Sequence, residues 1–145
     1  MKVATFAENG VDRVGIVVDD TIIPVVGAPD MIGLIADFET WQPKLRELET
    51  AGSGALPLAS VKLRAPVARP GKILAIGLNY ADHVAESGRP VPEQQMWFLK
   101  ASSSTSGPFD PIQLPRVSPG SVDYEVELVA VIGKGGRHIS REEAP

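Results

Sequence analysis

Lys72 to Glu86 read KILAIGLNYADHVAE, and this stretch decides the fold of the second half of the chain. Residues 72–76 form an apolar run of strand length, and Gly77 directly after them can turn the chain. Asn79 can cap a helix, and residues 80–87 can make two helical turns before a pair of prolines stops them. The stretch therefore predicts a strand, a tight turn and a short helix.

Two polar side chains, His83 and Glu86, lie three residues apart on the predicted helix and share one face. A carboxylate beside an imidazole fixes its tautomer and raises its basicity, which a general base requires. The alternative is an ordinary surface helix with polar residues in solvent, and the pair alone favours it. The position of the helix, directly after the end of an apolar strand, favours the functional interpretation.

Two more strands are predicted further along the chain. Residues 96–99 are a short apolar strand, and a polar, serine-rich loop follows them over residues 102–106. Lys100 ends this strand and could meet an anionic substrate, although such a lysine can equally reach water. Residues 122–132 are the longest strand candidate, and they are apolar on both faces for half their length. That pattern predicts a central strand covered on both sides.

Three acids, Asp123, Glu125 and Glu127, share one face at the start of the long strand candidate. Residues two apart on a strand lie about 6.5–7 Å apart, so the two glutamates can converge on one ion. Oxygen ligands at about 2.0–2.6 Å suit Mg²⁺, Mn²⁺ or Ca²⁺. The alternative, which the pattern alone favours, is a strand end that emerges into solvent and leaves the acids hydrated.

The N-terminal part predicts a small β-rich unit with two helices. The strands are expected over residues 3–6, 14–18 and 21–26, with turns at Glu8-Asn9-Gly10 and Asp19-Asp20. A short helix is expected from Asp30 to about Asp37, and a second helix that begins near Thr40 as its N-cap and ends at Ala51-Gly52-Ser53-Gly54. The second helix carries an apolar stripe of Trp41, Leu45 and Leu48.

A change in composition over residues 61–71, with Pro66 and Pro70, predicts the boundary between two units. We expect a small N-terminal domain over residues 1–65 and a second domain over residues 70–145. The 145 residues are enough for one good core or two small ones.

The composition excludes several classes of function. The net charge of −4 argues against nucleic acid as the main partner, because phosphate binding needs a basic face. No run of about 18 apolar residues and no secretory leader occur, so we expect a cytoplasmic protein without a membrane partner. The chain has no cysteine and only two histidines, so carboxylates are the expected source of metal ligands.

Several segments together resemble the fumarylacetoacetate hydrolase family. The stretch quoted first matches the family pattern GxNYxxHxxE. Further matching segments follow in the family's order: Phe98-Leu99-Lys100, the spacing Gly107, Ile112, Leu114-Pro115, then Asp123 to Leu128 and Val131 to Lys134. The N-terminal unit, with Arg13-Val14-Gly15, looks like the small domain that many bacterial members carry ahead of the core.

The resemblance implies an α+β fold, in which the small N-terminal β-rich domain precedes the first part of a mixed-sheet, rolled core. It implies that Glu125 and Glu127 are two of three carboxylate ligands of Mg²⁺, Mn²⁺ or Ca²⁺. It implies that His83 and Glu86 orient and activate water, and that Lys100 lies near the substrate. Members act on small 2-oxo or β-diketo acids, and a homodimer is expected.

Two departures from the family pattern matter. Ala101 stands where many members have proline after the lysine, which is a loop detail. More seriously, the family's third metal carboxylate and a further catalytic lysine belong after the glutamate strand, and no plausible third ligand follows Glu127 here. The chain could be a fragment, another chain could supply the third carboxylate and the lysine, or the site could be inactive.

The resemblance leaves three functional hypotheses. The first is metal-dependent hydrolysis of a C–C bond in an acylpyruvate or fumarylacetoacetate type of diketo acid. The second is an oxaloacetate decarboxylase, hydratase or isomerase on the same scaffold. The third is a non-catalytic binding module or fragment that lacks the third metal ligand.

Overall fold

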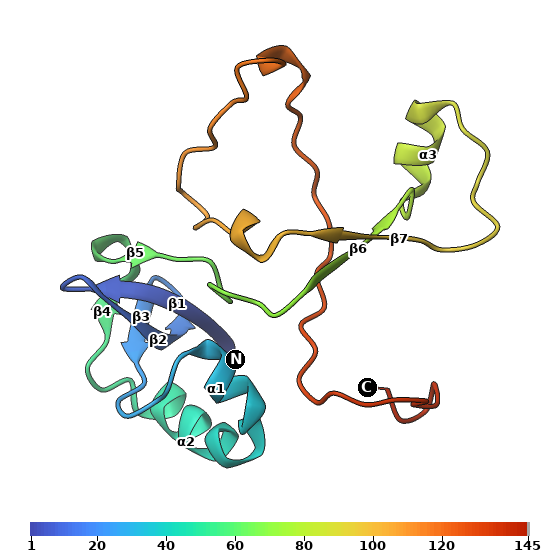
Figure 1. Ribbon diagram of the computed structural model, residues 1–145. Coiled ribbons are helices and arrows are strands. Elements are labelled where there is room, and N and C mark those ends of the chain that lie inside the picture. The colour runs from blue at the N-terminus through green and yellow to red at the C-terminus, as the bar shows by residue number, and fades with distance from the viewer. Residues whose placement is uncertain (145) are drawn as a thin grey trace.

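The computed structural model describes residues 1–144 and has two parts of different character (Figure 1). The first is an α+β unit, which confirms the predicted class. Its elements are β1 (Lys2–Glu8), β2 (Val11–Val18), β3 (Thr21–Pro24), α1 (Met31–Ala36), α2 (Phe38–Ala51), β4 (Leu56–Pro57) and β5 (Lys62–Leu63). The second part holds β6 (Ile73–Gly77), α3 (Ala81–Ser87) and β7 (Met96–Lys100), followed by a long irregular segment.

The N-terminal unit is built on one antiparallel sheet with the strand order β4-β3-β2-β1-β5. The β1–β2 hairpin turns at Asn9 and Gly10, whose φ angles of 50° and 80° are the positive values of a type I′ turn. Asp19 (φ 48°) begins the next turn. Both predicted turns are therefore confirmed. They form at these residues because Asn, Gly and Asp tolerate the left-handed conformation.

Both helices lie on one side of this sheet and supply half of its core (Figure 1). The buried cluster consists of Val14, Ile16, Val25, Met31, Leu34 and Leu45, with Trp41 and Leu48 packed against it. The predicted apolar stripe of α2 thus faces the sheet. No helix within residues 1–144 has both the length and the hydropathy that a membrane crossing needs.

In the N-terminal unit, the helix boundaries agree with the predictions except at the start of α2. Asp30 caps α1, since its side chain accepts a hydrogen bond from Gly33 N at 2.9 Å. The prediction that α2 begins near Thr40 is wrong, because the helix begins at Phe38 after Asp37. The Asp37 carbonyl accepts from the amides of both Thr40 and Trp41, at 3.1 and 3.2 Å, and so pairs two amides of the first turn without a side-chain cap.

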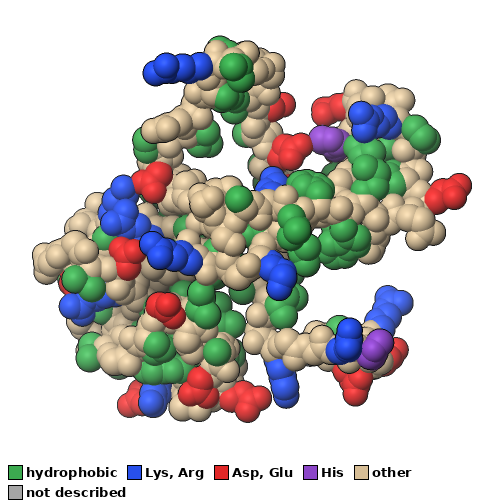
Figure 2. Space-filling model, in the orientation of Figure 1, with side chains coloured by type: hydrophobic (Ala, Val, Ile, Leu, Met, Phe, Trp, Pro, Cys, Tyr) green, Lys and Arg blue, Asp and Glu red, His purple; other side chains and the backbone are tan. Residues whose placement is uncertain are grey.

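Strands β6 and β7 form a two-stranded antiparallel ribbon, with α3 in the connection between them. Both strands match the predicted runs to within a residue. Helix α3 begins one residue later than predicted, with Tyr80 rather than Asn79 at the N-cap, and Gly88 (φ 63°) ends it before the prolines do. The ribbon carries many exposed apolar side chains, which are visible as green patches in Figure 2.

The prediction of a covered strand over residues 122–132 is wrong for the part of the chain that the structure describes. The segment has no strand pairing and its side chains are exposed; Leu128, for example, is 92% exposed. The alternation of side chains is present in the sequence, but a strand also needs a neighbour to pair its backbone groups. Within residues 1–144, no neighbouring strand provides that ladder.

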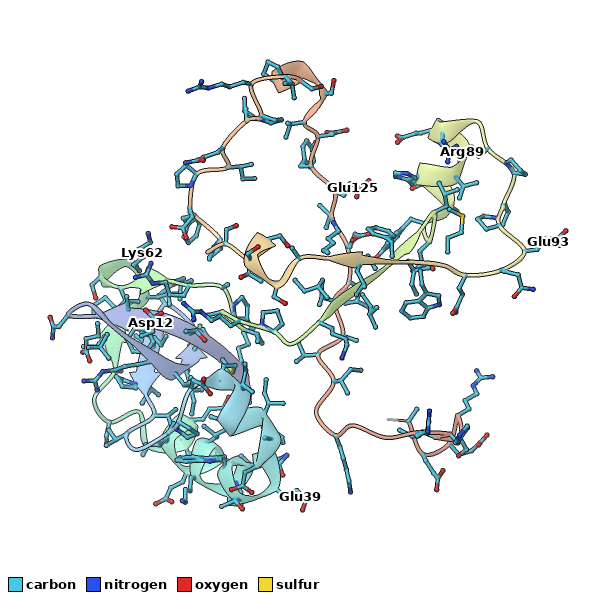
Figure 3. The ribbon with its side chains drawn as sticks, viewed as in Figure 1. Asp12, Glu39, Lys62, Arg89, Glu93 and Glu125 are labelled. Carbon is cyan, nitrogen blue, oxygen red and sulfur yellow. The ribbon has the colours of Figure 1, made fainter. Side chains whose placement is uncertain are left out.

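The loop after β7 is fastened to the N-terminal unit near β5 (Figure 3). Lys62 Nζ lies 2.6 Å from Asp110 Oδ1, and Asp110 Oδ2 accepts from Gly107 N at 3.0 Å. Thr105 Oγ1 donates to the Ala68 carbonyl at 2.9 Å. Gly107 is buried here, and a Cβ on it would lie 3.0 Å from the Leu63 carbonyl, so a larger residue would not fit without a shift.

The Asp110 carboxylate makes this fastening sensitive to acid. The hydrogen bond from Lys62, followed by that from Gly107 N, lowers the pKa of Asp110 below its ordinary value. A lowered folded-state pKa means that the contribution to stability is full above the unfolded value of about 3.9 and is lost as the pH falls through the folded value.

We expect the Gly107 amide proton to titrate with an apparent pKa below that of an ordinary aspartate. An NMR titration between about pH 2 and pH 6 measures this directly. Lys62→Met should move the midpoint back toward about 3.9, and Lys44→Met, which removes a lysine that lies over Trp41, should leave it unchanged. A wild-type midpoint at the ordinary value would contradict the assignment.

Candidate functional site

The site residues are brought together by the turn between β6 and α3. Leu78 has a φ of 53°, which is uncommon for a residue other than glycine and costs about 1–2 kcal/mol. This conformation reverses the chain after Gly77, so that α3 begins at once at the end of the ribbon. Val84 is the buried residue of α3, and its burial leaves His83 and Glu86 exposed.

The central contact of the site joins α3 to the C-terminal segment. His83 Nδ1 lies 3.4 Å from Glu125 Oε1, although the two residues are 42 positions apart (125 − 83). Their side chains are 48% and 54% exposed, and an ion pair that exposed contributes at most about 1 kcal/mol to stability. The contact therefore adds little to the stability of the fold.

Glu125 lies on the stretch of the C-terminal segment that passes on the α3 side of the ribbon (Figure 3). A carboxylate beside Nδ1 favours the tautomer that carries its proton on Nδ1, which leaves the other ring nitrogen free to accept a proton. The arrangement thus suits proton transfer at Nε2.

A second contact beside the first was not predicted from the sequence. The Leu128 backbone N–H donates a hydrogen bond to the Tyr80 hydroxyl at 2.7 Å. Tyr80 is the N-cap residue of α3, and its carbonyl accepts from Val84 N at 3.0 Å. The only sequence feature that could have drawn attention to this residue is its place between Asn79 and His83 in the family pattern.

The remaining predicted site residues lie apart from this contact. Glu86 lies one turn further along α3, and no hydrogen bond or ion pair joins it to His83 in the part of the chain that the structure describes. Lys100 pairs with Ile73, at the opposite end of the ribbon from the Gly77–Met96 pair that leads into α3. Its Nζ lies 5.9 Å from the centre of the Phe98 ring.

Glu125 and Glu127 have the right chemistry for a hard divalent cation, since both offer only oxygen. Across residues 1–144, however, no group of three or more His, Cys, Asp or Glu side chains is placed so that it could hold a metal ion. The two glutamates therefore fit as part of a ligand set, and the described residues do not complete that set.

The chain was compared with known protein families. Residues 72–145 match the family described as fumarylacetoacetate (FAA) hydrolase C-terminal. This match covers half of the chain and includes every residue of the candidate site.

Curated proteins with similar sequences are enzymes of small oxo acids by name. The 2,4-didehydro-3-deoxy-L-rhamnonate hydrolase of Sphingomonas sp. (strain SKA58) is 40% identical over 151 residues, covering 99% of this chain and 48% of that protein. Human mitochondrial oxaloacetate tautomerase FAHD2A is 47% identical over 89 residues, covering 61% of this chain and 28% of that protein. The chain thus spans less than half the length of these relatives.

A solved structure supports the same relationship. The maleylpyruvate hydrolase from Sphingobium sp. SYK-6, in complex with manganese(II) ion and pyruvate, aligns with a TM-score of 0.65 and 35% identity. The alignment covers 81% of this chain and 43% of that one. The predicted fold, a small N-terminal unit followed by the first part of a core of this family, is confirmed.

Proposed function

Because the chain belongs to the fumarylacetoacetate hydrolase family, we propose that it takes part in divalent-metal-dependent hydrolysis of a C–C bond in a small diketo acid. The substrate class is that of acylpyruvates or fumarylacetoacetate. The single observation that carries the proposal is the contact of 3.4 Å between His83 and Glu125. It joins the two motif segments that the family pattern places far apart in the sequence.

We assign the metal to Glu125 and Glu127, with further ligands outside the described residues. Support comes from the oxygen-only donors of this pair and from the manganese ion named for the maleylpyruvate hydrolase. The proposal extends to any of the three hard divalent ions Mg²⁺, Mn²⁺ and Ca²⁺ as the native metal. When bound, a divalent cation supplies positive charge to the carboxylate and 2-oxo oxygens of the substrate.

We assign to His83 the role of general base. Its imidazole takes one proton from water, and the remaining hydroxide attacks the carbonyl more distant from the carboxylate. The C–C bond on the carboxylate side of that carbonyl then breaks. With an acylpyruvate, the electron pair stays with the pyruvate fragment, whose methylene carbon takes up a proton, and the acyl fragment leaves as a carboxylic acid. Pyruvate, the molecule named in the maleylpyruvate hydrolase complex, would be the product common to acylpyruvates, and fumarylacetoacetate would release acetoacetate in its place.

The other assignments follow the family pattern. Glu86, one turn along α3 from His83, would orient the attacking water together with it, and Lys100 would meet the substrate carboxylate. A division into domains at residues 1–65 and 70–145, a homodimer and a cytoplasmic location also remain proposals.

The metal assignment is tested by calorimetry on the intact protein. We expect Mn²⁺ to bind the wild type, and Glu125→Gln to weaken that binding at least tenfold, because it replaces an anionic ligand by a neutral amide of the same size. Glu47→Gln, an exposed acid on α2, is the matched control and should bind as the wild type does. Equal affinities for the wild type and Glu125→Gln would exclude Glu125 as a ligand.

A second function is favoured by the relatives named as oxaloacetate tautomerases, which are among the more identical sequences. Tautomerisation of oxaloacetate moves a proton between carbon and oxygen and breaks no C–C bond, so it needs the same base but no attacking water. Product analysis separates the two functions. Pyruvate and acetate from acetylpyruvate support the hydrolase, whereas faster enol–keto exchange of oxaloacetate without cleavage supports the tautomerase.

A further inference from the structure

The N-cap residue of α3 and one residue of the helix itself contact two residues of the C-terminal segment, with the same spacing on both sides. Tyr80 and His83 are three apart, as are Leu128 and Glu125, and they pair in opposite order. The first pair joins the Tyr80 hydroxyl to the Leu128 backbone at 2.7 Å, whereas the second joins two side chains at 3.4 Å. The start of α3 is therefore docked on the glutamate segment at two points.

The register of this segment decides which side chains face His83. Along an extended chain, successive side chains point to opposite faces, so a slip of one residue would present Val126 or Tyr124 in place of Glu125. In most sheets a ladder of backbone hydrogen bonds prevents such a slip. Among the described residues, the segment has no ladder partner, and the Leu128–Tyr80 bond is its one backbone hydrogen bond to another element.

Hydrogen-bond chemistry explains why a tyrosine serves at this position. A backbone N–H needs an acceptor, and the Tyr80 hydroxyl oxygen supplies one from the N-cap position, only three residues before His83. A phenylalanine would keep the ring and lose the acceptor. The ring holds the hydroxyl with few rotatable bonds, so little conformational freedom is lost when the oxygen accepts from Leu128 N.

We propose that Tyr80 is a positioning residue that sets the register of the glutamate segment, so that Glu125 and Glu127 face the site. The inference rests on the function proposed above and adds a residue to it. Tyr80 acts through Leu128 on the two glutamates and does not itself touch the substrate. It thereby explains a position of the family pattern that neither base catalysis nor metal binding requires.

The test uses Tyr80→Phe in the intact protein, with Tyr124→Phe as the matched control. Tyr124 is the only other tyrosine, lies on the same segment and is 85% exposed. Amide hydrogen exchange at Leu128 reports the hydrogen bond itself, and we expect it to become about fivefold faster in Tyr80→Phe alone. Exchange at Val84, on the buried face of α3, should stay unchanged and so show that the helix remains folded.

Mn²⁺ affinity and steady-state kinetics then test whether Tyr80 positions Glu125 and Glu127. We expect Tyr80→Phe to weaken Mn²⁺ binding several-fold and to lower kcat for acetylpyruvate at saturating Mn²⁺, whereas Tyr124→Phe leaves both unchanged. The inference is overturned if Leu128 exchange is unaltered, or if the wild type binds Mn²⁺ and Tyr80→Phe binds it equally well. A wild type that binds no Mn²⁺ at all would instead refute the proposed function.

Discussion

Replacing His83 by asparagine is expected to lower kcat for acylpyruvate hydrolysis by about 10²–10⁴-fold, which corresponds to about 3–5 kcal/mol of transition-state stabilisation. Asparagine keeps a polar side chain beside Glu125 but cannot take a proton from water. The fold should survive the change, because His83 is half exposed and its contact with Glu125 adds at most about 1 kcal/mol to stability.

The measurement is steady-state kinetics at saturating Mn²⁺ on the intact protein, with the release of pyruvate as the readout. His138→Asn is the matched control, since His138 is the only other histidine. It has a φ of 56°, a conformation that asparagine tolerates, so the control should not disturb the backbone. Activity of His83→Asn within a few-fold of the wild type would remove His83 from the mechanism.

Glu125 and His83 were predicted as site residues from separate segments, but their contact was not. Spacing along a strand or helix predicts which side chains share a face, and this local rule cannot relate residues 42 positions apart (125 − 83). The pairing first expected for His83 was with Glu86, its neighbour on the helix. The structure places the Glu125 carboxylate at the imidazole because the C-terminal segment passes α3 at that point.

Tyr80 escaped prediction for a related reason. Its partner is a backbone N–H, which every residue except proline has, so no residue type in the sequence marks Leu128 as the donor. Sequence patterns reveal pairs of unusual side chains more readily than side-chain contacts to the main chain.

The N-terminal unit was the more predictable half. Alternating apolar residues and the Asn9-Gly10 turn predicted the first three strands, because hairpins depend on neighbouring residues. Strands β4 and β5 were missed, since two residues are too few to show a period, and these strands exist only through pairing with β3 and β1. Residues 122–132 show the reverse, a clear alternation for which the described chain provides no partner strand.

The stability of the N-terminal unit depends on a few fully buried side chains, of which Phe6 is among the largest. Phe6 lies in the middle of β1, is 0% exposed, and faces Gly15 and Ile22 across the neighbouring strands. A Cβ built on Gly15 would lie 2.9 Å from the Phe6 ring and 2.6 Å from Ile22, so the glycine is what makes room for both side chains.

Phe6→Ala should therefore lower the free energy of unfolding by about 3–5 kcal/mol, because it removes buried apolar surface and leaves a cavity that rigid strands cannot collapse. The total stability of a domain is about 5–15 kcal/mol, so the variant should unfold at much lower urea concentration, or fail to fold.

Phe109→Ala makes the same chemical change at a side chain that is 83% exposed, and should change the free energy of unfolding by less than about 0.5 kcal/mol. Urea titrations followed by circular dichroism compare the two variants, with Phe6→Leu as an intermediate that keeps most of the volume. Equal losses for Phe6→Ala and Phe109→Ala would mean that burial in this sheet does not govern the stability of the unit.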